Sequence, residues 1–151
     1  MICSFMIEVI NLLLKTIVCG IILISSSAVG YLISLRYSLR VKQLNYFLNS
    51  LNGLETEIIY YSTPLPLAMD RVAKRSDKSI SNIFEETSRM LSSREGYRID
   101  EAWKKAVMRS ENMTSLSKED IEIIINFGKD LGIGNNEIQS KHFKFIKILL
   151  D

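Results

Sequence analysis

The feature that most constrains this chain is an uncharged run near its N-terminus. Residues 16–35 read TIVCGIILISSSAVGYLISL and carry no charged side chain, with Lys15 before the run and Arg36 after it. A helix of this length rises about 30 Å, which matches the hydrocarbon thickness of a bilayer. The sequence therefore predicts a transmembrane anchor over residues 12–35, preceded by an N-terminal tail over residues 1–11.

Charges on the two sides of the run predict its orientation. The residues that follow it closely are basic: Arg36, Arg40 and Lys42. On the other side Lys15 is partly offset by Glu8. By the positive-inside rule, residues 36–151 are expected on the cytoplasmic side of the membrane.

A cleaved signal peptide is the alternative for this segment. Lys15, the apolar run to Ile24 and the small residues up to Ala28 have the required order. The apolar run resumes at Val29 and continues to Leu35, however, which favours an anchor that stays in the membrane.

Beyond the anchor the apolar residues recur at steps of three and four, which is typical of amphipathic helices. The first such stripe is Leu44, Phe47, Leu48, Leu51, Leu54 and Ile58. We expect this helix to continue the membrane helix and to stop near Tyr60. Thr63 is placed to cap the next helix, with Pro64 at its first position.

Further helix boundaries follow from capping residues. A helix is expected after Ser79, Asp100 is expected to cap a short helix, and Ser117 with Asp120 approximates a capping box. Gly132 is suited to end the helix that this box opens. A last helix is expected from about Asn136. The predicted fold class is therefore all-α, a transmembrane helix followed by a compact bundle of about five or six helices over residues 36–151.

Two residues of this bundle have predicted packing roles. Trp103, the single tryptophan, is expected to anchor the core, and its buried indole N–H then needs an acceptor. Gly128 suits a close approach between two helices.

The sequence gives little support for catalysis, metal binding or nucleic-acid binding. Both cysteines, Cys3 and Cys19, lie in the first twenty residues, and His142 is the single histidine. The chain has no GxxxxGK[ST], GxSxG, HExxH or CxxC motif. Its 19 basic and 17 acidic residues give no strong electrostatic reason to bind nucleic acid. We therefore expect no enzyme activity, no cofactor, no metal and no small-molecule substrate.

One charge pattern suggests a binding surface. Four basic residues are spaced to lie along one helix face if that helix persists: Arg71, Lys74, Arg75 and Lys78. They could meet anionic lipid or an acidic partner, although a solvated face shared with Asp70 and Asp77 is the alternative. A second, looser set follows later in the chain: Lys141, Lys144 and Lys147.

Two acidic residues are the other docking candidates. Glu55 and Glu57 lie close to the turn at Thr63-Pro64-Leu65-Pro66 and have no evident local basic partner. They are two residues apart, so they lie on different helix faces and make a poor acid/base pair. The less favoured alternative is a membrane-tethered hydrolase that uses one of them.

Several segments occur in an order that is familiar from one family. They are LETEI at 54–58, YSTPLP at 61–66, AW at 102–103, FGKDLG at 127–132 and Gln139. With the N-terminal anchor they resemble the stage III sporulation protein AB family of endospore-forming Firmicutes. The likeness covers about residues 12–148, and the LETEI, TPLP and FGKDLG segments are its most specific parts.

The resemblance implies a function that periodicity and composition alone do not indicate. Members of that family belong to the channel, or feeding apparatus, between mother cell and forespore, and their helical domain looks like the inner-membrane platform protein of type II secretion systems. The implied partners are stage III sporulation protein AA, a secretion-type ATPase, and other channel membrane proteins. Family members usually continue into a second membrane segment, whereas this chain stops at Asp151, and Met6 is an alternative start.

Together these observations predict a non-catalytic platform or adaptor that is required for endospore formation. It would sit in the cell membrane by a single N-terminal span, with its bulk facing the mother-cell cytoplasm. The alternative is a generic membrane-tethered scaffold of a secretion or pilus-like system. The oligomeric state and the surface that docks the partner stay open at this point.

Overall fold

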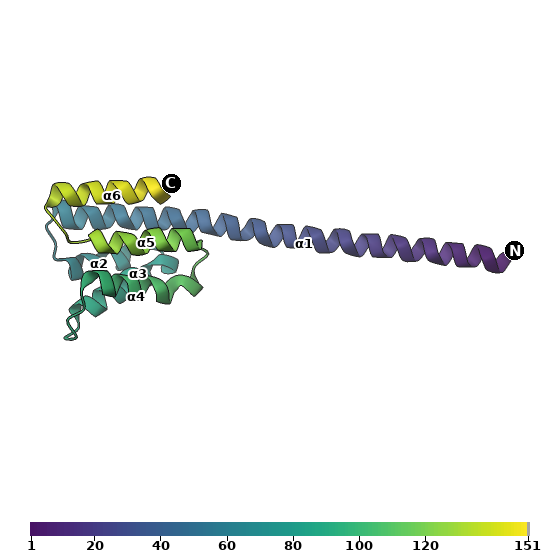
Figure 1. Ribbon diagram of the computed structural model, residues 1–151, viewed down its shortest axis with the longest axis horizontal. Coiled ribbons are helices and arrows are strands. Elements are labelled where there is room, and N and C mark those ends of the chain that lie inside the picture. Colours follow the sequence, from purple (N-terminus) through teal and green to yellow (C-terminus); the bar gives the residue numbers. More distant parts are fainter. Residues whose placement is uncertain (151) are drawn as a thin grey trace. The chain divides into compact units, whose positions relative to one another are not determined.

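The computed structural model describes residues 1–150 and is built from helices, with no strand among those residues. The long elements are α1 (Ile2–Glu55), α2 (Leu65–Arg75), α3 (Lys78–Ser92), α4 (Ile99–Ser110), α5 (Lys118–Asp130) and α6 (Asn136–Leu150) (Figure 1). Two short elements join them, a π-helical turn η1 (Thr56–Tyr60) and a 3-10 turn η2 (Glu111–Met113). The all-α prediction is confirmed.

The chain divides into two compact units, Met1–Ser38 and the remainder from Leu39 on. In the first unit α1 is mostly apolar and almost entirely exposed, and it is long and apolar enough to cross a membrane. Hydroxyl groups within it donate to carbonyls of the preceding turn, as Ser25 Oγ does to Ile21 O at 2.8 Å. Such bonds satisfy a hydroxyl inside lipid. The expected tail over residues 1–11 is helical from Ile2.

The second unit is a bundle in which α2, α3, α4, α5 and α6 pack in chain order. The C-terminal part of α1 supplies a core face, because Phe47, Leu51 and Leu54 are fully buried. As predicted, this part belongs to the same helix as the apolar segment, and the helix gives way to η1 at Thr56.

A chain of aromatic contacts crosses the bundle core. It runs through Phe47, Phe84, Trp103, Phe127 and Phe143, with ring centroids 5.2–6.4 Å apart. Trp103 is fully buried and its Nε1–H donates to Ile124 O at 2.6 Å, so the predicted anchor and its acceptor are confirmed.

Gly128 permits the contact between α4 and α5. A Cβ at this position would lie 2.1 Å from Trp103 Cδ1, much closer than any real contact. The expected role in close helix packing is confirmed.

Helix boundaries follow the predictions in part. Ser117 and Asp120 form the capping box of α5, and Gly132 adopts φ 79° after the helix ends. One predicted cap and one predicted helix start are wrong. Arg98, not Asp100, is the N-cap of α4, and α3 begins one residue before Ser79, since Asp77 accepts a hydrogen bond from the Ser79 N–H and caps it.

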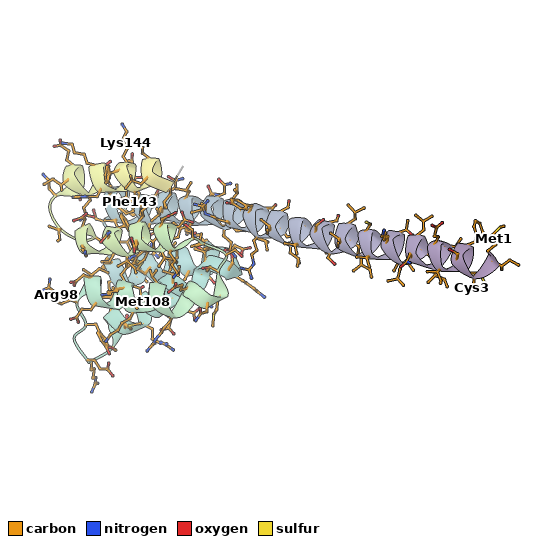
Figure 2. The ribbon with its side chains drawn as sticks, turned by 45° about the vertical axis from the view of Figure 1, so that its right-hand side comes forward. Met1, Cys3, Arg98, Met108, Phe143 and Lys144 are labelled. Carbon is orange, nitrogen blue, oxygen red and sulfur yellow. The ribbon has the colours of Figure 1, made fainter. Side chains whose placement is uncertain are left out.

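Figure 2 shows the two faces of α6: Phe143 points into the bundle and Lys144 points away from it. The inward residues Phe143, Ile146 and Leu150 are buried. Helix α6 therefore closes the core beside α5.

Candidate functional site

The first feature of interest is Glu57, a predicted docking residue that lies in η1. It is buried, with 2% of its surface exposed. Its Oε2 accepts hydrogen bonds from Thr63 Oγ1 at 2.9 Å and from Arg71 Nη1 at 2.8 Å. Arg75 Nη1 lies 3.4 Å from the other oxygen, Oε1. The expectation that this carboxylate has no basic partner is wrong, because the turn after η1 brings α2 beside the end of α1.

These contacts set the ionisation of Glu57. Hydrogen bonds from Arg71 and Thr63 hold the pKa of this carboxyl below its usual value, and they outweigh burial, which raises it. A general acid needs a raised pKa and access to its substrate. Glu57 has neither, so this arrangement suits a fixed ion pair that orients two arginines.

The turn between η1 and α2 completes this network. Thr63 N–H donates to Glu57 O at 2.9 Å, and Ser62 adopts the left-handed conformation with φ 50°. The predicted cap at Thr63 is wrong: Pro64 is the N-cap of α2, and Thr63 uses its hydroxyl on Glu57 instead. Pro66 lies within the first turn of α2, where its missing N–H costs little.

The other predicted acidic residue, Glu55, contacts a different helix. Lys147 Nζ donates to Glu55 Oε2, and Ser140 Oγ donates to Oε1 at 3.3 Å. Glu55 therefore ties α1 to α6, whereas Glu57 ties η1 to α2. The placement on different helix faces is confirmed, and the expected lack of a basic partner is wrong here too.

The four basic residues do not form one stripe. Helix α2 ends at Arg75 because Ser76 is extended, and Lys78 opens α3. Lys74 Nζ donates to Asp70 Oδ2 at 2.6 Å, one turn away on the same helix. Of the four, Arg71 and Arg75 are the two that contact Glu57.

The second basic set is also divided among different neighbours. Lys141 Nζ lies 3.0 Å from Glu137 Oε1, and Lys147 pairs with Glu55. Lys144 is exposed on the outer side of α6 (Figure 2). The three side chains therefore do not act as one patch.

A groove of about 480 Å³ opens between α1 and α2 beside the Glu57 network. It is lined by Tyr46, Asn49, Ser50, Gly53, Val72, Arg75, Ser76 and Asp77. Ser50 and Ser76 meet in its wall, with their hydroxyl oxygens 2.6 Å apart. Of the six predicted docking residues, Arg75 is the one that reaches this groove.

The chain offers few groups for metal chemistry. Among residues 1–150, no group of three or more His, Cys, Asp or Glu side chains lies close enough to hold a metal ion. His142 Nδ1 lies 3.5 Å from Asp130 Oδ2, and both cysteines are exposed on α1.

One partly buried ion pair joins residues that the sequence patterns did not connect. Arg40 donates through Nε and Nη2 to the two oxygens of Asp120, at 2.6 and 2.8 Å. Burial raises the pKa of Asp120, but hydrogen bonds from Arg40 and Ser117 outweigh it and hold the pKa below its usual value. The capping motif indicated the place of Asp120; nothing in the sequence pattern indicated that Arg40 joins it.

Three comparisons identify relatives of this chain. Residues 15–151 match the family model described as stage III sporulation protein AB. The stage III sporulation protein AB of Bacillus subtilis (strain 168) is 29% identical over 132 residues, which cover 87% of this chain and 77% of that protein. A solved structure with the same name is similar with a TM-score of 0.69 at 30% identity, covering 75% of this chain and 88% of the other.

Proposed function

Because the chain belongs to the stage III sporulation protein AB family, we propose that it is a membrane-anchored platform of the channel between mother cell and forespore. In this role it docks a secretion-type ATPase, stage III sporulation protein AA, and it performs no chemistry itself. Residues 12–35 form its anchor, and residues 36–151 form its cytoplasmic bundle.

The observation that carries this proposal is the continuity of α1. The helix that holds the exposed apolar segment also supplies Phe47, Leu51 and Leu54 to the bundle core. Helix α1 therefore contributes residues both to the proposed anchor and to the core of the proposed docking domain.

The chemistry of the acidic residues supports a binding role over a hydrolase. Glu57 is buried and its pKa is lowered by Arg71 and Thr63. Glu55 is held by Lys147 and Ser140. Both carboxylates are engaged in contacts between helices, which favours a structural use of their charge.

The test is binding of the full chain, reconstituted in zwitterionic lipid nanodiscs, to purified stage III sporulation protein AA. We expect a saturable complex at low salt. Empty nanodiscs provide the control for lipid binding by the ATPase. Absence of a complex, with and without nucleotide, would contradict docking of this ATPase.

A further inference from the structure

We propose that the groove between α1 and α2 is the place where an acidic segment of the cytoplasmic partner binds, with Arg75 as the residue that pairs with its carboxylate. This inference rests on the proposed function, since it takes the ATPase as the partner. It goes beyond that function by assigning the surface and the chemistry of the contact.

The first argument is that two arginines share one carboxylate. Glu57 supplies one carboxylate, and Arg71 already donates to it at 2.8 Å. Arg75 lies farther off, at 3.4 Å, and its side chain is 72% exposed. A single buried carboxylate thus faces two guanidinium groups, so positive charge remains at the surface for an acidic partner.

The second argument is the shape and lining of the site. The groove has a volume of about 480 Å³, and Arg75 lies at it together with polar groups from both helices. Asn49 is exposed there and has both a donor and an acceptor in its side chain, which suits the backbone of an extended segment. Tyr46 adds an aromatic surface of the kind that is enriched at protein interfaces.

The third argument is the nature of the nearby charges. Asp77 is the acidic residue of the lining, and its carboxylate already accepts from the backbone N–H and hydroxyl of Ser79. Those hydrogen bonds hold the pKa of Asp77 below its usual value, with Lys42 contributing attraction. Asp77 therefore stays ionised and is already bonded to Ser79 at the start of α3, so Arg75 is the charged residue of the lining that can pair with an incoming carboxylate.

The fourth argument is Gly53, which leaves the floor of the groove open. A Cβ there would meet only Val72 Cγ2, at 3.8 Å, which is an ordinary contact. An alanine is therefore accommodated without strain, whereas a longer side chain extends into the groove. This difference gives a steric probe that does not alter charge.

The experiment measures the affinity of stage III sporulation protein AA for full-length variants in zwitterionic nanodiscs. We expect Arg75→Glu to weaken binding about tenfold or more, because it opposes the partner's carboxylate. Lys74→Glu is the matched control: it makes the same charge change at the adjacent position, where Lys74 pairs with Asp70. It should change affinity less than about threefold.

The steric arm uses Gly53→Gln, which should also weaken binding about tenfold or more, with Gly53→Ala as the control that leaves it unchanged. Trp103 fluorescence checks that each variant keeps its fold. If Arg75→Glu and Gly53→Gln both bind with wild-type affinity, the groove is not the binding site, but the proposed function still stands. If the wild-type chain does not bind the ATPase, both the proposed function and the assignment of an ATPase segment to the groove are wrong.

Discussion

Arg40 and Asp120 are joined by two parallel hydrogen bonds, Nε to Oδ2 at 2.6 Å and Nη2 to Oδ1 at 2.8 Å, although eighty residues separate them. The same carboxylate accepts the Ser117 N–H in the capping box of α5. One buried aspartate thus caps the start of α5 and holds α1 against that helix.

Removal of this carboxylate should destabilise the bundle. We expect Asp120→Ala to lower the free energy of unfolding by about 2–4 kcal/mol, because it removes two charge-assisted hydrogen bonds from Arg40 and the capping contact with Ser117. Urea unfolding of the full chain in detergent, followed by Trp103 fluorescence, measures the change. Arg98→Ala breaks an exposed pair with Asp100 and should cost less than about 1 kcal/mol. Equal effects of the two variants would contradict the assigned role of Asp120.

The same pair predicts a pH dependence. The pKa of Asp120 is lower in the folded protein than in the unfolded chain, so the folded state binds fewer protons. Its contribution to stability is therefore complete above the unfolded pKa and is lost as the pH falls through the folded one. We expect stability to fall below about pH 5, and Asp120→Asn to flatten this slope. Unfolding curves at several pH values test it; an unchanged slope in the variant would count against the assignment.

Two glycines should respond in opposite ways to the same substitution. Gly128→Ala places a methyl group against Trp103 and should destabilise the protein by about 1–3 kcal/mol. Gly53→Ala lies in a helix with room for the methyl group and should stabilise it by up to about 1 kcal/mol. Thermal unfolding followed by circular dichroism compares them. A neutral Gly128→Ala would show that α4 and α5 can separate without cost.

The Thr63 hydroxyl should matter through Glu57. Thr63→Val keeps the side-chain shape but removes the donor to Oε2, so we expect the unfolding midpoint to fall by about 2–4 °C. Thr56→Val is the control, since Thr56 donates to Asn52 O on an exposed helix turn. Identical midpoints for the two variants would show that the Glu57 network contributes little to stability.

The membrane anchor can be tested by introducing a charge. Leu23→Arg places a cation in the centre of the uncharged run, at a cost of about 2.5–3.5 kcal/mol for insertion. We expect this variant to leave the membrane fraction, whereas Ile7→Arg in the proposed tail should remain in it. Fractionation with and without detergent measures both. If Leu23→Arg stayed in the membrane and Ile7→Arg left it, the boundaries of the anchor would need revision.

Local signals in the sequence predicted much of the fold. The periodicity of apolar residues, the capping box at Ser117 and the glycine after α5 act within a few positions, and the structure confirms them. Local reasoning was wrong at Thr63, because its hydroxyl has a competing use. It could cap α2 or bond to Glu57, and only the packing of η1 beside α2 favours the second.

What the sequence by itself determined is the helical class, the apolar segment and the core residues, because these depend on the order and hydropathy of neighbouring residues. Tertiary structure decided which charges meet. Arg40 pairs with Asp120, and Glu55 pairs with Lys147. Glu57 lies closer to Arg71 than to Arg75. Residues that are 14 to 92 positions apart form these pairs. A long-range ion pair depends on distances of a few ångströms between packed helices, and no local pattern encodes those distances.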